Sequence, residues 1–419
     1  MIENLLPFLM FGILMAAVLA KPLAKQKLVP VPVALMLLGF VSSEIWVSLG
    51  QDTGLRWQIL RDLVFYLILP VLIFEASINI NIKLLRREGL LVLSLAVPLL
   101  IVATLISATV IHFLIGGLLG SMWSLALLCG AMICATDPTT VSNILNGTKS
   151  PGRVFSILEG ESLINDATTI TLFVMISSVL TLPGYEMNLL VMAGQFTLIL
   201  MGSMLVGLCL GWLFNLIIKP LDDVVLTTSV TLVLAFVSFW AGEHILGWSG
   251  VVSTLSAGLT IAWLQRKSRD DEDVEFALGS WRTLGFLANA MLFFLVGMSI
   301  TIDMFQIHWL TMLTGILAVF LSRAAIIYLG AGPLSRLPRQ QSLSLAEQNL
   351  MLWGGIRGAV AIALALSLSV DIPHWYTIQS MVYGVALFSL VFQSPFFSLL
   401  TDKSRRLKSP HNRDLHPRY

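Results

Sequence analysis

Residues 122–146 read MWSLALLCGAMICATDPTTVSNILN, an apolar stretch with a carboxylate and a proline near its middle. Pro138 has no N–H to donate to the carbonyl of Cys134, and its ring disfavours α geometry at Asp137. At membrane depth, free backbone carbonyls are tolerated only where they line a cavity or bind something. The stretch therefore predicts a membrane helix that is interrupted for binding. The alternative is a simple proline kink in which Asp137 caps the second half-helix.

The whole chain is almost as apolar as this stretch. Of its 419 residues 57% are hydrophobic and 12% charged, and the mean hydropathy is +0.87. A soluble domain carries about 25% charged residues, so a water-exposed surface of this size cannot be built. The net charge of +1 gives no reason to expect nucleic acid as a partner. We therefore expect an all-α polytopic membrane protein whose surroundings are the lipid bilayer.

Apolar segments of membrane-spanning length follow one another along the chain, with short loops between them. A membrane helix needs about 20 mostly apolar residues. On this criterion we predict thirteen spans, at residues 5–20, 29–49, 62–80, 90–115, 122–146, 153–182, 188–217, 225–243, 249–264, 283–301, 309–331, 343–369 and 375–400.

The lysines and arginines test this count, because they favour cytoplasmic loops. With thirteen spans, all but four of the 25 basic residues fall in odd-numbered loops or in the C-terminal tail. Arg56 and Arg61 lie on the opposite side, and Arg323 and Arg357 lie within spans. We expect a multi-pass protein of the cell (inner) membrane, with its N-terminus outside and its C-terminus in the cytoplasm.

Ionisable residues inside the spans indicate a functional site, because placing each one in the hydrocarbon region of the bilayer costs several kcal/mol. If both of the arginines pair with carboxylates, three acids remain, which predicts a cation site rather than an anion site. The residues in question are Glu75, Asp137, Glu159, Glu161, Asp166, Arg323 and Arg357.

The sixth span carries the sequence EGESLIND at residues 159–166. At 100° per residue, Glu159, Ser162 and Asp166 fall within roughly 60° of one another, whereas Glu161 and Asn165 turn away by roughly 100–140°. Counted from the cytoplasmic end, Asp166 lies roughly 20 Å deep, near the midplane, and Glu159 about 10 Å nearer the cytoplasm, in position to line an access funnel. The alternative for Asp166 is a purely structural hydrogen-bonding role.

The twelfth span contains WGGIRGAV at residues 353–360, whose glycines let another backbone approach and make the helix easy to unwind. At midplane Arg357 needs a carboxylate, and we predict Glu161 as its partner. Three roles are open for Arg323: it pairs with a site acid, caps a half-helix at its C-terminus, or neutralises crossing helix dipoles. Glu75 either reaches the site from a neighbouring domain or turns to the cytoplasmic interface.

Three motifs together resemble those of the NhaP-type monovalent cation–proton antiporters, which are related to the animal Na⁺/H⁺ exchangers. They are Thr136–Asp137–Pro138, the run from Glu159 to Asp166, and Gly355–Ile356–Arg357–Gly358. The resemblance covers nearly the whole chain. It implies two inverted repeats with two crossing discontinuous helices, the NhaA/NapA-like antiporter fold, and a homodimer.

The resemblance also implies a division of the chain into domains. Helices 1–3 (residues 1–88) and 7–10 (184–301) would form the dimer interface domain. Helices 4–6 (89–183) and 11–13 (302–402) would form the core, and residues 403–419 a short cytoplasmic tail.

For the site, the resemblance implies that Asp166 carries the cation and the proton in turn and that Asn165 orients the site. Its coordination of Na⁺ would be completed by four further groups, and the pair Glu161–Arg357 would be stabilising. The further groups are Asp137, Ser162, Glu75 and the carbonyl of Thr136; the supporting residues are Arg323, Glu159 and Pro138.

The expected function is thus secondary active antiport of a monovalent cation against H⁺. We expect Na⁺ as the cation, with Li⁺ or K⁺ as alternatives, and a role in pH homeostasis. We expect no enzyme activity and no cofactor besides the transported ions. Because Asn165 is neutral, Asp166 has no second carboxylate beside it, which predicts an electroneutral 1:1 cycle. The alternatives are a K⁺-selective antiporter and a cation channel. The channel is disfavoured because no ring of repeated selectivity residues is present.

Overall fold

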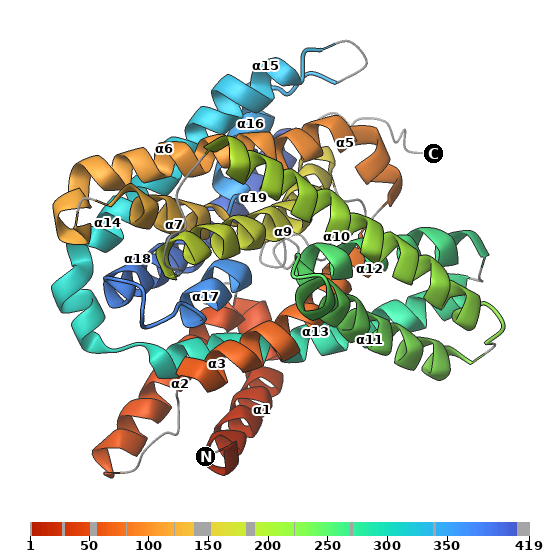
Figure 1. Cartoon of the computed structure of the whole chain (residues 1–419), viewed down its shortest axis with the longest axis horizontal. Coiled ribbons are helices and arrows are strands. Elements are labelled where there is room, and N and C mark those ends of the chain that lie inside the picture. The colour runs from red at the N-terminus through yellow and green to blue at the C-terminus, as the bar shows by residue number, and fades with distance from the viewer. Residues whose placement is uncertain are drawn as a thin grey trace, which may run out of the picture.

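The computed structural model describes residues 2–26, 30–50, 57–80, 82–120, 122–137, 152–181, 189–221, 223–268, 271–337 and 341–408. Over these ranges the chain forms helices joined by short connections, and it contains no strand (Figure 1). Pro138 lies outside the described residues, so its predicted role in the interrupted helix stays a prediction.

The first helices are α1 (Ile2–Gln26), α2 (Val31–Ser48), α3 (Trp57–Leu63), η1 (Val64–Ile68), α4 (Leu69–Asn79), α5 (Ile82–Ala96), α6 (Pro98–Ile115), η2 (Gly116–Leu119) and α7 (Trp123–Cys134). The middle of the chain contains α9 (Arg153–Thr181), α10 (Leu189–Ile218), α11 (Val224–Trp240), η3 (Ala241–Ile245), α12 (Gly250–Ser268) and α13 (Asp271–Ser299). The last helices are α14 (Ile302–Ala325), η4 (Ile326–Ala331), α15 (Gly332–Leu334), α16 (Leu345–Gly354), α17 (Ala359–Leu366), α18 (Trp375–Phe388), η5 (Ser389–Gln393) and α19 (Ser394–Lys408).

Every predicted span overlaps at least one of these helices. Among the described residues, nine helical stretches are long and apolar enough to cross a membrane, and three shorter apolar helices accompany them. The expectation of an all-α polytopic protein is therefore confirmed, whereas the number thirteen remains a prediction. The nine stretches are Val31–Ser48, Leu85–Leu119, Arg153–Thr181, Leu190–Ile218, Val224–Ile245, Glu275–Ser299, Ile302–Leu334, Leu345–Leu366 and Trp375–Thr401.

Helix α9 runs through the middle of the molecule and carries the EGESLIND motif. It packs against α5 and α7 on one side and against α10 and α12 on the other (Figure 1). The start of α9 is fixed by Arg153, which donates to both carboxylate oxygens of Glu88 on α5, at 2.8 and 3.0 Å. The same guanidinium donates to the carbonyl of Gln341, at 2.5 Å. One basic side chain therefore joins three segments at this end of the molecule.

Helix contacts fall into two groups on either side of α9. In one group α13 packs against α2 and α4, and α10 against α12. The close approach of α10 to α12 depends on Gly207 and Gly211, because a Cβ at either position would overlap with α12 atoms. In the other group α14 packs against α6 and α18, and α6 against α7.

Two helices end abruptly inside the molecule. Helix α7 ends at Cys134 and is followed by non-helical backbone at residues 135–137. Helix α16 ends at Gly354, and α17 starts only at Ala359, so residues 355–358 are non-helical as well. Both interruptions lie where the sequence motifs predicted them. The glycines at 355 and 358 account for the second one, because they weaken a helix and allow close backbone contact.

Candidate cation-binding site

The two interruptions meet each other. The backbone N–H of Asp137 donates to the carbonyl of Ile356, at 2.7 Å, so the two non-helical segments are hydrogen-bonded directly. A Cβ on Gly358 would overlap with the carboxyl group of Asp137, and for this reason only glycine fits there. Two segments more than 200 residues apart in the sequence therefore form one site.

Arg357 closes the end of α7. Its Nη1 donates to the carbonyls of Cys134, at 2.6 Å, and Ala135, at 3.0 Å, which are left without helical donors by the interruption. The C-terminal end of a helix carries partial negative charge, and a buried guanidinium stabilises it. Arg357 is 2% exposed, and within the described part of the chain it forms no ion pair with Glu161.

Glu161 pairs instead with Arg323. The guanidinium of Arg323 binds the carboxylate in a bidentate manner, through Nη1 to Oε1 and through Nη2 to Oε2 at 3.0 Å. Its Nη2 also donates to the carbonyl of Met351 in the last turn of α16, at 3.2 Å. The predicted pair Glu161–Arg357 is thus wrong. That prediction assigned a carboxylate to a buried guanidinium, whereas Nη1 of Arg357 donates to the carbonyls at the end of a helix instead.

The end of α16 has a second stabilising group that the sequence analysis missed. Gln393, on the π-turn η5, donates from Nε2 to the carbonyls of Trp353, at 3.0 Å, and Gly355, at 3.1 Å. Ser389 donates to its Oε1, at 2.8 Å, and so fixes the orientation of the amide. The only signal of this role in the sequence is a single amide within an apolar span.

Helix α9 is joined to the first interruption by two side chains. Ser162 Oγ donates to the carbonyl of Thr136, and Asn165 Nδ2 donates to the hydroxyl of Thr136, at 2.7 Å. Ser162, Asn165 and Thr136 are all buried. The predicted site residues of the fifth and sixth spans are therefore brought together, and Asn165 holds the orientation of Thr136.

Two oxygens of this cluster have no hydrogen-bond partner. In the part of the chain that the structure describes, neither Oδ1 of Asp166 nor Oδ1 of Asn165 accepts a hydrogen bond, and both atoms are buried. Asp166 is 9% exposed and interacts electrostatically with Asp137. An unsatisfied buried acceptor costs about 1–3 kcal/mol, and more when it is charged. The carboxylate oxygen of Asp166 can therefore receive a proton or a cation, and the amide oxygen of Asn165 can bind a cation.

Glu75 approaches the cluster from α4. Asn79 donates to its Oε1, at 3.1 Å, and Gly285 of α13 lies directly against its side chain. Arg282 in turn donates to Oδ1 of Asn79, at 3.1 Å. The carboxylate of Glu75 interacts electrostatically with Glu159 of α9, which is partly buried, and with Asp137. Glu75 and Glu159 therefore lie at the edge of the cluster.

The donor set consists of oxygens alone. Carboxylates, an amide, hydroxyls and a backbone carbonyl suit a hard cation, whereas soft or transition metals favour thiolate and imidazole ligands. Among the described residues, no three His, Cys, Asp or Glu side chains are grouped to hold a metal ion. The arrangement can hold a small cation that is stabilised by carboxylate charge.

Comparisons with known proteins identify the family of the chain. Residues 10–403 match the family model for the sodium/hydrogen exchanger, transmembrane. The Na⁺/H⁺ antiporter NhaH of Halobacillus dabanensis is 30% identical over 391 residues, which cover 91% of this chain and 94% of that protein. The Na⁺/H⁺ antiporter NhaP of Pseudomonas aeruginosa is 28% identical over 345 residues, 78% of this chain and 77% of the relative.

A solved structure shows the same fold. The sodium proton antiporter MjNhaP1 from Methanocaldococcus jannaschii, determined at pH 8, superimposes with a TM-score of 0.80. The superposition covers 96% of this chain and 99% of that chain, at 21% sequence identity. The helical membrane architecture expected from the sequence is therefore confirmed.

Proposed function

The chain belongs to the sodium/hydrogen exchanger family, and we propose that it exchanges Na⁺ for H⁺ one for one, by competition of the two ions for Asp166. Cation–proton antiport itself follows from the family, and the chain is a transporter rather than an enzyme. The proposal concerns the ion, the stoichiometry and the residues that carry them.

One observation carries the proposal: Asp166 and Asn165, which are consecutive on α9, each have a buried oxygen without a partner among the described residues. Asp166 Oδ1 and Asn165 Oδ1 accept no hydrogen bond among the described residues. Either a proton on Asp166 or a cation beside it removes the penalty of a buried, uncompensated charge. One carboxylate charge balances only one of these ions at a time, and such mutual exclusion is what obligatory exchange requires.

The neighbouring groups complete the coordination. We assign Asp137, Ser162 and the carbonyl of Thr136 to the cation, together with Asp166. No three acidic side chains are grouped among the described residues in this conformation, so we assign Glu75 to the same cation after a movement of α4 toward the core. Ser162 donates to the Thr136 carbonyl, but a hydroxyl oxygen and a carbonyl oxygen each keep a lone pair when they share one hydrogen bond. Both oxygens therefore remain able to bind a cation without breaking the contact that positions them.

The charges around the site support an electroneutral cycle. Glu161 is neutralised by Arg323, so it is removed from the transport chemistry. Asn165 is neutral and leaves Asp166 without a second carboxylate directly beside it on α9. A single carboxylate that alternates between H⁺ and Na⁺ moves no net charge over a complete cycle.

Alternating access is the remaining part of the proposal. Residues 89–183 and 302–402 would move as a core against an interface domain of residues 1–88 and 184–301, which forms a homodimer in the inner membrane. The packing of α6, α7, α14 and α18 with one another supports a separate core. Glu75 belongs to α4, in the other group, so such a movement would change its distance from Asp166.

Purified protein in vesicles tests the proposal. Asp166→Asn is expected to abolish proton flux on addition of Na⁺, whereas Asp303→Asn, on an exposed residue, preserves it. An imposed membrane potential should leave the steady-state Na⁺ gradient unchanged. Normal exchange by Asp166→Asn contradicts the assignment of Asp166, and a gradient that follows the potential contradicts the 1:1 stoichiometry. Separate additions of Na⁺, Li⁺ and K⁺ identify the ion.

A further inference from the structure

A further unpartnered oxygen lies on α9, three residues beyond Asp166. Thr169 is fully buried, and its Oγ1 has no hydrogen-bond partner among the described residues. A threonine inside a helix ordinarily donates to the carbonyl four residues earlier. Two neighbours do so: Thr168 donates to Ile164, at 3.1 Å, and Thr171 to Ala167, at 2.8 Å. The hydroxyl of Thr169 is therefore oriented differently from theirs.

The position of Thr169 places it on the same face as Asp166. Residues three apart on a helix are neighbours, with Cβ atoms about 5–6 Å apart. Asn165 Oδ1, Asp166 Oδ1 and Thr169 Oγ1 thus form a cluster of three buried, unpartnered oxygens within little more than one helical turn. The desolvation penalty of three such atoms favours a ligand that all of them share.

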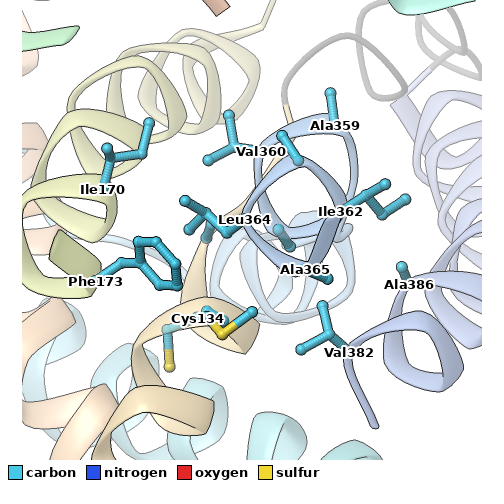
Figure 2. Packing of buried hydrophobic residues seen from close by; sticks show 14 of the residues in the cluster. Cys134, Ile170, Phe173, Ala359, Val360, Ile362, Leu364, Ala365, Val382 and Ala386 are labelled. Carbon is cyan, nitrogen blue, oxygen red and sulfur yellow. The ribbon is translucent and has the colours of Figure 1, made fainter. Parts of the chain in front are cut away.

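The polar face of α9 ends directly after Thr169. Figure 2 shows Ile170 and Phe173 of α9 pointing toward Val360 and Leu364 of α17, above Cys134 at the end of α7. All five side chains are buried. On this face of α9, Thr169 therefore carries the side-chain oxygen that directly adjoins the apolar contact.

We propose that the hydroxyl oxygen of Thr169 is a ligand of the transported monovalent cation and helps to determine which cation is preferred. The inference rests on the proposed function, because it needs a cation at Asp166. A hydroxyl adds a neutral, hard oxygen, so it changes affinity and selectivity while leaving the exchange ratio unaltered.

Matched variants of the full chain test this role. Thr169→Val replaces the hydroxyl with a methyl of nearly the same volume, and Thr169→Ser keeps the oxygen. Thr171→Val is the control, since Thr171 is equally buried on the opposite side of the same helix and its hydroxyl is already satisfied. The apparent KM and the maximal rate are measured for Na⁺ and Li⁺ in proteoliposomes. Thermal stabilisation by each cation is measured in detergent, because a ligand stabilises the folded state in proportion to its binding.

For Thr169→Val we expect KM for Na⁺ to rise about tenfold, the fold-change that corresponds to about 1.4 kcal/mol. The ratio of the KM values for Na⁺ and Li⁺ should change too, and the maximal rate should fall less than KM rises. Thr169→Ser and Thr171→Val should behave like the unmodified protein.

Unchanged KM values and unchanged cation stabilisation in Thr169→Val would overturn the inference, as would an equal shift in Thr171→Val. If Thr169→Val shows unchanged KM values while Asp166→Asn is inactive in the same vesicles, only the role of Thr169 is excluded. The proposed function then still stands. If Thr169→Val does not fold, Thr169→Ala, which also lacks the hydroxyl, replaces it and is judged by the same KM values and cation stabilisation. A large shift in Thr169→Ser, which retains the oxygen, would also contradict the inference.

Discussion

At the residue scale, the two buried arginines show how a guanidinium is satisfied inside a membrane protein. Arg323 has a carboxylate partner in Glu161, and Arg357 has two backbone carbonyls at the end of α7. Removing one member of a buried ion pair leaves an uncompensated charge, whereas removing both members is far less harmful. The pairing can therefore be tested by comparing single and double substitutions.

For the ion pair we expect Glu161→Met and Arg323→Met each to destabilise the protein by about 3–5 kcal/mol. The double variant should lose much less than the sum of the two, because neither charge remains buried alone. Melting temperature and yield of the purified protein measure the effect. The matched pair Glu161→Met with Arg357→Met should show no such recovery. Recovery in that second pair would contradict the assignment of partners.

Gly358 makes a separate prediction at the same scale. A methyl group at this position meets the carboxyl group of Asp137, so Gly358→Ala should separate the two interruptions and break the bond from Asp137 to Ile356. We expect exchange to fall at least about tenfold, the equivalent of one 1.4 kcal/mol contact. Gly279→Ala on α13, which has no atom within 4 Å of the new methyl, is the control. Equal activity of the two variants would show that the contact is unimportant.

At the scale of elements, each broken helix must satisfy the carbonyls at its cut end. Arg357 does this for α7, and Arg323 and Gln393 do it for α16. The π-turn η5 ends at Gln393, and such turns are frequent at functional sites because they shift a side chain out of the regular helical register. The site thus depends on helix termini as much as on its carboxylates.

We therefore expect Gln393→Leu to lower the melting temperature. The substitution leaves the carbonyls of Trp353 and Gly355 without donors, at about 1–3 kcal/mol each. Gln393→Glu, which has the same shape but no amide donor, should be no better. Scanning fluorimetry of purified protein checks this, with Gln58→Leu on an exposed glutamine as the control. A melting temperature equal to that of the control would rule out this capping role.

At the scale of the whole molecule, the distribution of basic residues predicts which surface faces the cytoplasm. In a cysteine-free background, Leu49→Cys and Leu337→Cys place one thiol on each proposed side, at residues that are 66% and 45% exposed. A membrane-impermeant maleimide should label Leu49→Cys in intact cells and Leu337→Cys only after permeabilisation. The reverse pattern would invert the proposed topology.

Much of this molecule was predictable from local properties of the sequence. Hydropathy predicted a helical membrane protein, and the residues TDP and GGIRG predicted where two helices are interrupted. Of the predicted site residues, Ser162 and Asn165 both contact Thr136, while the role of Asp166 stays a prediction. Such features follow from periodicity, hydrophobicity and the chemistry of proline and glycine, which act over a few residues.

The class of fold, the positions where helices end and the buried polar residues therefore follow from the amino-acid order alone. Their pairing follows from the folded arrangement: Glu161 with Arg323, Arg357 with the end of α7, and Gln393 with the end of α16. That arrangement also shows which oxygens remain unpartnered on α9. The physical reason is that partner choice depends on distances between segments far apart in the chain. A backbone carbonyl, which every residue has, competes there with any carboxylate for a buried guanidinium.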